Sequence, residues 1–451
     1  MAKFRSDERQ QLFLLPPSIQ DWLPENHLAR FVVDIVAQLN LDNITNQYNN
    51  KGGEAYLPRM LVALLFYGYA TGVFSSRKLE RGTYDSVALR FVAANTHPDH
   101  DTIATFRRRF HKEIAGLFSQ VLLFAHTAGL LKLGTVSLDG SKVKANASKH
   151  KALSYQHACK LEEQIRGQVE ELLSLAESAD QANLPDELSL PEELSRRENR
   201  LQAIREAKAE IERRAEERHK IEQQEYEQKM AEREKKVKEG GGKARGKEPQ
   251  PPVPGPGPKD QVNLTDPESR IMPKGKSFKQ AYNAQAGVDT KSMLILGQRI
   301  TQHSNDKEEL IPMLKELAHL PEELGKLDRL LCDAGYFSEK NVKACLEAKV
   351  EPFIASGREA HNQSALSRFT EPQESCPCIA GDPVGNMRHR LRTKAGKALY
   401  GLRKSTVEPV FGIIKSILGL RQFSFRGKEL VASEWGIVCT AWNIKRLHLL
   451  I

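Results

Sequence analysis

The sequence has few cysteines and no long hydrophobic run, and both absences narrow the class of protein. Only six cysteines occur among 451 residues, and they are scattered along the chain. This usage does not suit a disulfide-stapled secreted domain, and it predicts a protein of the reducing cytoplasm. The most apolar stretch, residues 61–74, is too short to cross a bilayer and holds two glycines. We therefore expect a buried helix there and no membrane partner.

Two further signals are missing. The chain runs from Met1 into charged residues without an apolar block, so no secretory signal is expected. The one close cysteine pair, Cys376 and Cys378, lacks a second pair or a nearby histidine at finger-like spacing, which favours a loop over a zinc site. What remains is an ordinary globular composition, 40% hydrophobic and 28% charged, with enough length for two or three domains.

The net charge is positive and unevenly distributed. It amounts to +9, although residues 156–240 hold more acidic than basic side chains, so the rest of the chain is more basic than this figure. A polyanion such as DNA is a natural partner for such a surface. Solubility alone is an equally good explanation of charge taken by itself.

Residues 1–130 are expected to form an all-helical domain. Apolar residues recur at helical spacing over 28–39, and a second apolar stretch covers 60–74. In the segment 102–110 an apolar face is flanked by three arginines. A helix held to a bundle by such a face, with arginines outward, suits DNA contact, although any soluble helix is built similarly. The apolar face consists of Ile103, Phe106 and Phe110, and the expected DNA contacts are Arg107, Arg108 and Arg109.

The composition changes sharply over residues 155–240, where Glu, Gln, Arg, Lys and Ala dominate. Helix formers at this density, interrupted by Pro185 and Pro191, predict a charged helical hairpin resembling a coiled coil. Its apolar seam is thin, so we expect it to need a partner surface. Residues 241–261 are rich in glycine and proline, which predicts a linker. The seam consists of Leu201, Ile204, Ile211 and Ala215.

Sheet character occurs on both sides of this insert. Residues 135–139 alternate apolar and polar and end at Asp139, after which Gly140 and Ser141 offer a turn. Residues 281–288 and 293–300 are expected to pair as strands. An apolar run over 327–333 ends at Asp333, and a helix over 338–349 and a strand over 352–355 follow. In this strand–helix–strand unit, Asp333 lies at the carboxyl end of the first strand, where open sheets bind ligands.

The C-terminal part is basic and helical, and it carries Glu408 on a face separate from an apolar stripe. Asp139, Asp333 and Glu408 together suit phosphodiester chemistry, because two divalent ions about 4 Å apart can activate the attacking oxygen and stabilise the leaving one. Magnesium prefers such hard oxygen ligands. Two carboxylates about 4 Å apart would otherwise repel by roughly 4 kcal/mol at a dielectric near 20.

Each carboxylate also has an ordinary structural explanation. Aspartates at strand ends often only form turns, and a glutamate flanked by lysines often makes a surface pair. Asp289 and Asp306 also lie near expected strand ends, so position alone does not select Asp333.

Motifs along nearly the whole chain resemble the DDE insertion-sequence transposases of bacteria, above all the cut-and-paste families with an N-terminal helical domain. Each motif is weak alone, but their order and completeness make the resemblance specific. The motifs are residues 14–24, 67–77 and 98–109 near the start, Leu138–Lys142, Thr265–Arg270 with Tyr282–Gln285, Asp333–Tyr336, Val407–Gly412 with Lys415, and residues 443–447.

The resemblance implies an α/β fold with a ribonuclease-H-like mixed-sheet core, formed by residues 131–154 and 262–451 and interrupted by the hairpin. It implies that Asp139, Asp333 and Glu408 bind two Mg²⁺ or Mn²⁺ ions. Related families often place an arginine one helical turn before the glutamate, whereas Lys404 holds that place here and Arg403 precedes it, so either could contact phosphate. The residues expected to contact DNA in this core are Lys142, Lys144, Tyr400, Arg403, Lys404 and Lys415.

By the same resemblance we expect a transposase that binds double-stranded DNA at the inverted repeats of its element, cleaves there, and joins the 3′-hydroxyl to target DNA. Positioning two DNA ends calls for at least a homodimer on DNA, within the bacterial nucleoid. Three alternatives stay open at this point: a nuclease without strand transfer, a non-catalytic DNA-binding protein derived from a transposase, and an interaction scaffold built on the hairpin.

Overall fold

The computed structural model describes residues 18–48, 54–179, 190–240, 248–275, 277–357 and 382–451. The chain divides into two compact units, Met1–Lys144 with Tyr282–Ile451, and Ala145–Ala281. Within the described ranges no helix is both long and apolar enough to span a membrane. Four cysteines are free, namely Cys159, Cys332, Cys345 and Cys439. The Cys376 and Cys378 pair lies outside the described residues.

The central sheet is mixed, with the strand order β4-β5-β1-β7-β8 and with β6 also paired to β5. β1 runs parallel to β7, and β7 runs parallel to β8. β5 is antiparallel to β6 and, along its first residues, to β4. The bounds are β1 Thr135–Lys144, β4 Arg270–Lys274, β5 Ser277–Asp289, β6 Ile295–Thr301, β7 Arg329–Cys332 and β8 Glu351–Ile354.

Chain connections explain this mixture of directions. A short turn joins β5 to β6, which allows antiparallel pairing, whereas β7 and β8 are linked through helix α11 (Glu339–Glu347) and are therefore parallel. The Ser338 hydroxyl begins α11 by accepting a hydrogen bond from the Asn341 amide at 3.1 Å. The sequence-based predictions of the β5–β6 pair and of the strand–helix–strand unit are confirmed.

One local prediction is wrong. Gly140 and Ser141 do not form a turn, because β1 continues without interruption from Thr135 to Lys144. Asp139 therefore lies within a ten-residue strand, at the point where its pairing with β7 ends. The absence of a side chain at Gly140 instead lets neighbouring side chains pack closely against β1.

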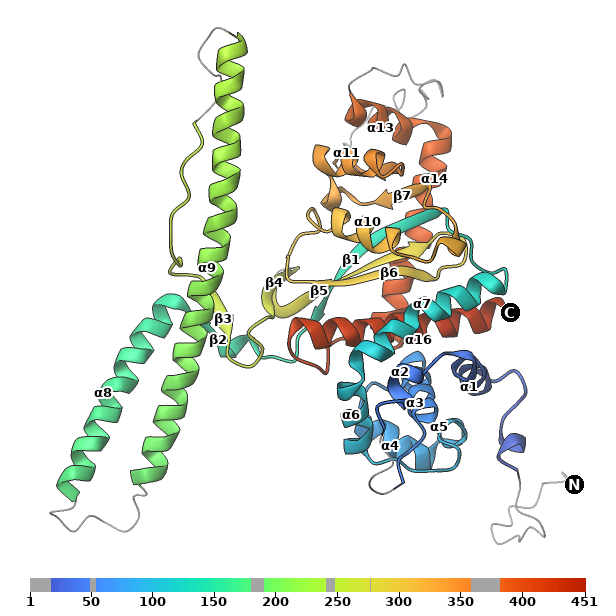
Figure 1. The fold of residues 1–451 in the computed structure, drawn as a ribbon, viewed down its shortest axis with the longest axis horizontal. Helices are drawn as coiled ribbons and strands as arrows, with labels where there is room; N and C mark the ends of the chain where they lie inside the picture. The colour runs from blue at the N-terminus through green and yellow to red at the C-terminus, as the bar shows by residue number, and fades with distance from the viewer. Residues whose placement is uncertain (1–17, 49–53, 180–189, 241–247, 276, 358–381) are drawn as a thin grey trace, which may run out of the picture. The chain divides into compact units, whose positions relative to one another are not determined.

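The N-terminal region is helical, as expected, and it packs within the same unit as β1 and β5–β8. Figure 1 shows α16 (Lys428–Leu450) lying between the sheet and the N-terminal helices, and it contacts β6, α3 and α7. The described N-terminal helices are thus grouped with the sheet in one compact unit. These helices are η1 Ile19–Trp22, α1 Leu28–Gln38, α2 Asp42–Thr45, α3 Pro58–Ala70, α4 Ser76–Asp85, α5 Val87–Val92, α6 His100–Arg109 and α7 His111–Thr127.

The remaining helices of this unit flank the sheet. α10 packs on β6, α13 on β8, α14 on β7 and α15 on β1. Their bounds are α10 Leu310–Ala318, α13 Pro383–Arg392, α14 Lys394–Ser405 and α15 Val407–Gly412, with short turns η3 Glu322–Leu324, η4 Ala334–Tyr336 and η5 Ile413–Ile417. The expected apolar stripe of the C-terminal part is buried, as Val407, Phe411, Ile414 and Leu418 confirm.

Arg107 is part of a buried polar network between α6, α3 and α16. It is 6% exposed, and its guanidinium donates to the Tyr69 hydroxyl at 2.6 Å and to the Phe74 carbonyl at 3.1 Å. The Tyr69 hydroxyl donates in turn to Glu434, at 3.4 Å. Burial, followed by the Glu434 charge, raises the pKa of Tyr69 far above its usual value, so it remains a donor.

This network corrects the expectation that Arg107 contacts DNA. With internal acceptors and with its guanidinium 4.5 Å from the Phe425 ring, Arg107 stabilises the fold. Its neighbours Arg108 and Arg109 are exposed, as expected for the outer faces of α6. The apolar face of that helix is buried, in agreement with the sequence pattern.

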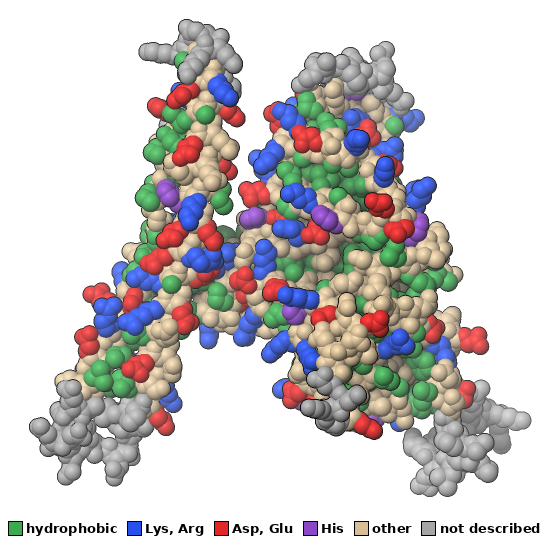
Figure 2. Space-filling view, viewed as in Figure 1, with side chains coloured by type: hydrophobic (Ala, Val, Ile, Leu, Met, Phe, Trp, Pro, Cys, Tyr) green, Lys and Arg blue, Asp and Glu red, His purple; other side chains and the backbone are tan. Residues whose placement is uncertain are grey.

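The second unit contains two antiparallel helices, α8 (Tyr155–Ala179) and α9 (Leu190–Gly240). As residue numbers rise along α8 they fall along α9: Tyr155 bonds Glu212, Glu162 bonds Arg205, and Gln168 bonds Arg197. Figure 2 shows acidic and basic side chains interspersed along both helices. A small sheet, β2 (Ala152–Ser154) with β3 (Gln261–Asn263), completes the unit, and η2 (Lys149–Lys151) precedes it.

The apolar seam of this pair is covered within the unit. Leu201, Ile204 and Ile211 of α9 are buried against Ala158 and Ile165 of α8. Leu153 of β2 and Val262 of β3 belong to the same buried cluster. Residues 248–260 contain no helix or strand, while residues 241–247 lie outside the described part.

Replacing Arg107 with alanine is expected to lower the free energy of unfolding by about 2–4 kcal/mol, because the Tyr69 hydroxyl and the Phe74 carbonyl then lose their charged donor. Urea unfolding monitored by circular dichroism measures the loss. Arg108→Ala, one residue away but exposed, should stay within about 0.5 kcal/mol of the wild type. Equal effects of the two substitutions would contradict the structural role of Arg107.

Candidate active site

The register of two parallel strands brings Asp139 and Asp333 to the same edge of the sheet. The last pair of the β1–β7 ladder is Leu138 with Cys332, and Asp139 and Asp333 are the residues that follow on the two neighbouring chain segments. Neighbouring strands lie about 4.8 Å apart. Two carboxylates distant in sequence are therefore adjacent in the fold.

Gly140 allows the elements around Asp139 to approach one another closely. A Cβ atom at this position would lie 2.2 Å from Gln285 Nε2 and 2.3 Å from Asp306 Oδ1. A side chain at position 140 would displace the side-chain amides of Asn283 and Gln285 or the carboxylate of Asp306. The glycine of the first-carboxylate motif is thus required by packing within the site.

Asp333 begins a short turn as well as facing the site. Its Oδ1 accepts a hydrogen bond from the Gly335 amide at 2.8 Å, which fixes the carboxylate at the start of η4. Asp289 is also a turn former, since its Oδ2 accepts bonds from the Lys291 and Ser292 amides and from the Ser292 hydroxyl. Asp289 is buried at the C-terminal end of β5, and its carboxylate is occupied by this turn, which removes it from consideration as a ligand.

Glu408 comes from the first turn of α15, the helix that packs on β1. It is 47% exposed, and it pairs with Arg403 of α14 at 3.1 Å. The same guanidinium lies 3.4 Å from Asp139 Oδ2. Arg403 therefore bridges two of the three expected carboxylates, and it supplies the positive charge that such a cluster requires.

The electrostatic environment of Asp139 is unusual for a carboxylate. Its pKa is raised to about 6, and burial is the largest cause; Arg403 and the Gly140 amide oppose the rise, while the carboxylates of Asp333 and Asp306 add to it. Burial deprives the charged form of Asp139 of the solvation that water would give it. The site thus favours an additional cation.

The residues expected to contact DNA near these carboxylates take different positions. Tyr400 is half-buried and donates to the Cys332 carbonyl at 3.2 Å, directly before Asp333. Lys415, on the π-helical turn η5, donates to the Ser141 hydroxyl and to the Lys142 carbonyl, which follow Asp139 and Gly140 along β1. Arg403 is 15% exposed and faces the carboxylates, whereas Lys404 and Lys144 are exposed to solvent.

The donor set fits divalent metal ions in its chemistry. It offers hard carboxylate oxygens around an Asp139 whose charged form is poorly solvated. Among the described residues, however, no group of three or more His, Cys, Asp or Glu side chains is close enough together to hold an ion. Arg403, which pairs with both Asp139 and Glu408, accounts for this arrangement physically.

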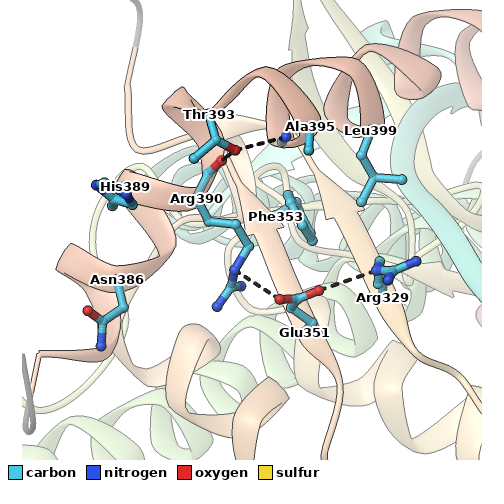
Figure 3. A pocket seen from close by; sticks show the side chains of 10 residues that line it. Arg329, Glu351, Phe353, Asn386, His389, Arg390, Thr393, Ala395 and Leu399 are labelled. Carbon is cyan, nitrogen blue, oxygen red and sulfur yellow. Dashed lines mark hydrogen bonds and ion pairs between the residues drawn. The ribbon is translucent and has the colours of Figure 1, made fainter. Parts of the chain in front are cut away.

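A cavity of about 530 Å³ lies away from the carboxylates, at the other end of β7 and β8 (Figure 3). In this cavity Glu351 pairs with Arg329 at 3.2 Å and with Arg390 at 2.9 Å, so the negative charge of the Glu351 carboxylate is compensated. Arg329 is the first residue of β7, while Asp333 follows the last one. This cavity is therefore separate from the edge that carries the candidate site.

A mixed sheet of this order, with acidic residues where the pairing of two parallel strands ends and with a helical N-terminal region, is consistent with a ribonuclease-H-like DDE enzyme. Residues 251–444 match the family described as transposase DDE domain, and residues 17–109 match a second transposase domain family, DUF772. The chain belongs to the DDE transposases of insertion sequences. No curated protein and no solved structure matches it.

This membership implies a metal-dependent enzyme that acts on nucleic acid, and it implies DNA binding. The matched ranges include Asp333, Glu408 and the α6 arginines but not Asp139. The assignment of Asp139 consequently depends on its strand register and on its contact with Arg403. The sequence did not distinguish Asp306 from the other aspartates near strand ends. In the structure its carboxylate lies next to Gly140, which makes it part of the site.

Gly140→Ala should disturb the site and destabilise the chain by about 1–3 kcal/mol, since the added methyl group overlaps Gln285 and Asp306. Thermal and urea unfolding test this expectation. Gly116→Ala on α7 is the matched control, because a Cβ there meets nothing within 4 Å. In an exposed helix that change should stabilise by roughly 0.5–1 kcal/mol. The two substitutions should change the free energy of unfolding in opposite directions, and equal changes would refute the packing argument.

The raised pKa of Asp139 predicts a pH-dependent effect of Asp139→Asn in metal-free protein. Folding raises the pKa of this carboxyl from 3.8 to about 6. At a pH above the folded-state pKa this shift lowers the free energy of unfolding, and at a pH below the unfolded-state pKa the loss disappears. The variant should therefore exceed the wild type in unfolding free energy by on the order of 1–3 kcal/mol near pH 8. Urea unfolding in EDTA measures the difference, which should shrink as the pH falls to about 4. A pH-independent difference would contradict this assignment.

Proposed function

We propose that this chain is a DNA transposase that binds the terminal inverted repeats of an insertion sequence, cleaves at the element ends and joins the freed 3′-hydroxyl to target DNA. The observation that carries the proposal is the placement of Asp139 and Asp333 side by side, with Arg403 linking Asp139 to Glu408. Membership in the transposase family supports this use of the site.

We infer that Asp139, Asp333 and Glu408 hold two Mg²⁺ or Mn²⁺ ions. Bound divalent ions would activate the attacking water or 3′-hydroxyl and stabilise the leaving oxygen. The protein contributes a rigid frame for this chemistry. β1 and β7 fix the two aspartates, and the Gly140 and Gly335 amides each donate to the aspartate of their own motif.

Arg403, rather than Lys404, is the better candidate for contact with the scissile phosphate. Its guanidinium already lies among the carboxylates, and a guanidinium can bind phosphate oxygens in a bidentate manner. Lys404 is exposed on the same helix and is suited to the DNA backbone further along. Tyr400 binds the end of β7 next to Asp333, and Lys415 binds β1 beyond Asp139, so we assign them positioning roles in addition to DNA contact.

The surface leading to the site is suited to DNA. Residues 383–407, which include α13 and α14, contain seven Lys or Arg residues and no Asp or Glu. Lys142 and Lys144 on β1, with Arg108 and Arg109 on α6, extend the set of basic side chains proposed to contact phosphates. Two DNA ends must be handled together, so we propose a homodimer on DNA.

The segment that carries α8 and α9, together with β2 and β3, lies in the sequence between β1 and β4. We infer that this segment is an insertion into a ribonuclease-H-like catalytic fold, because β1 and β4–β8 form their sheet without it. Contact with a transposon end or with a second copy of the chain is its proposed role.

An in vitro excision and joining assay tests the proposed function. It uses Mg²⁺ and DNA carrying the flanking inverted repeats, and it compares the wild type with Asp333→Asn. Metal-dependent joined product should form with the wild type and fall by at least about 100-fold in the variant, because the phosphoryl transfer loses its metal ligand. Cleavage without joining would indicate a nuclease. Binding of the repeats without cleavage would indicate a transposase-derived DNA-binding protein.

A further inference from the structure

Asp306 is an acidic side chain that the three-carboxylate motif does not include, yet the structure brings it to the same place. It lies in the loop between β6 and α10. Its Oδ1 accepts hydrogen bonds from Asn283 Nδ2 at 2.7 Å and from Gln285 Nε2 at 2.6 Å. Both amides come from β5, so this carboxylate is anchored to the central sheet.

The position of Asp306 relates it to both catalytic aspartates. Its Oδ1 is 2.3 Å from the point that a Cβ on Gly140 would occupy, immediately after Asp139. Its Oδ2 is 3.7 Å from the corresponding point on Gly335, and Asp333 Oδ1 is 3.0 Å from that same point. Asp306 therefore lies between the strand that carries Asp139 and the turn that carries Asp333.

Only one oxygen of Asp306 is engaged. Across the described ranges no group donates a hydrogen bond to its Oδ2, while its Oδ1 receives two. The surrounding loop is held in place, because buried Glu309 bonds both the Thr301 hydroxyl and His303 at 2.6 Å. A carboxylate fixed through one oxygen, with the other oxygen available, is prepared to bind a cation.

The side-chain oxygen of Asn283 is a second, independent feature of this position. Asn283 is 1% exposed, and within the described chain its Oδ1 has no hydrogen-bond partner. This atom lies 3.0 Å from the same Gly140 point as Asp306 Oδ1. A buried amide oxygen without a donor costs on the order of 1–3 kcal/mol, and a metal-bound water would supply the donor.

We propose that Asp306 is a fourth carboxylate of the metal centre, which binds a divalent cation through Oδ2, directly or through a water on that cation. The inference rests on the proposed function, since it concerns the same ions as Asp139 and Asp333. The competing role for Asp306 is purely structural, as an anchor for Asn283 and Gln285.

Asp306→Asn separates these two roles. The asparagine keeps an Oδ1 that accepts from both β5 amides, but it replaces the available anionic oxygen with an uncharged NH₂ group. The matched control is Glu308→Gln in the same loop, which removes the same charge from a side chain that is 69% exposed. Asp333→Asn serves as the reference for loss of a ligand.

The measurement is the dissociation constant for Mn²⁺, by titration of the full-length protein with detection of free Mn²⁺ by electron paramagnetic resonance. No DNA is needed, so the readout does not depend on activity. Asp306→Asn should weaken binding by roughly 10–100-fold, and Glu308→Gln should leave it unchanged. Melting temperatures in EDTA should be alike for the wild type and both variants, because no structural hydrogen bond is lost.

Wild-type affinity in Asp306→Asn, together with loss of affinity in Asp333→Asn, would overturn the proposal and leave Asp306 as an anchor only. If the wild type itself bound no Mn²⁺, the metal-dependent function would fail together with this inference. If Asp306→Asn were less stable in EDTA, Asp306→Glu would decide, because it retains a carboxylate. Affinity recovered in Asp306→Glu supports metal binding, whereas equal losses in both variants refute it.

Discussion

The parallel pairing of β1 with β7 is the constraint on which the candidate active site depends. Leu138 pairs with Cys332, and the residue after each is an aspartate. A shift of one residue in this register would turn one carboxylate to the other face of the sheet, because side chains alternate along a strand. The buried residues of both strands fix the register, and thereby the chemistry at the strand ends.

Carboxylates that lie together at one edge of a sheet repel one another, and Arg403 compensates part of their charge. The guanidinium contacts Asp139 and Glu408, while burial and the remaining carboxylates still raise the pKa of Asp139. The arrangement is therefore adapted to positive charge beyond one arginine. The same reasoning gives Asp306 a function, since an anchored carboxylate here increases the demand for cations.

The N-terminal helices are joined to the catalytic sheet through burial as well as charge. The network from Arg107 through Tyr69 to Glu434 lies between α6, α3 and α16, and α16 itself packs on β6. A buried charged network of this kind is costly unless every partner is present, so it specifies one arrangement of helices. We infer that it holds Arg108 and Arg109 of α6 in a fixed position within the unit.

Much of this protein follows from its sequence alone. The sheet character of residues 281–288 and 293–300 predicted the β5–β6 pair, and the short apolar run before Asp333 predicted β7, because the apolar pattern of a strand reflects its burial. The order of motifs predicted the transposase family, which the family matches confirm. These features are local, or they depend on order along the chain, and neither requires knowledge of distant contacts.

Other features were decided only by the tertiary structure. A row of three arginines has the same helical pattern whether or not Arg107 is buried, since burial depends on Tyr69 and Phe425 far along the chain. Gly140 resembled a turn residue because a glycine required by close packing has no local signature of its own. Asp306 could not be distinguished from Asp289 by position. Only the fold shows that Asp289 closes a turn, while Asp306 lies between Gly140 and Gly335 with one oxygen available.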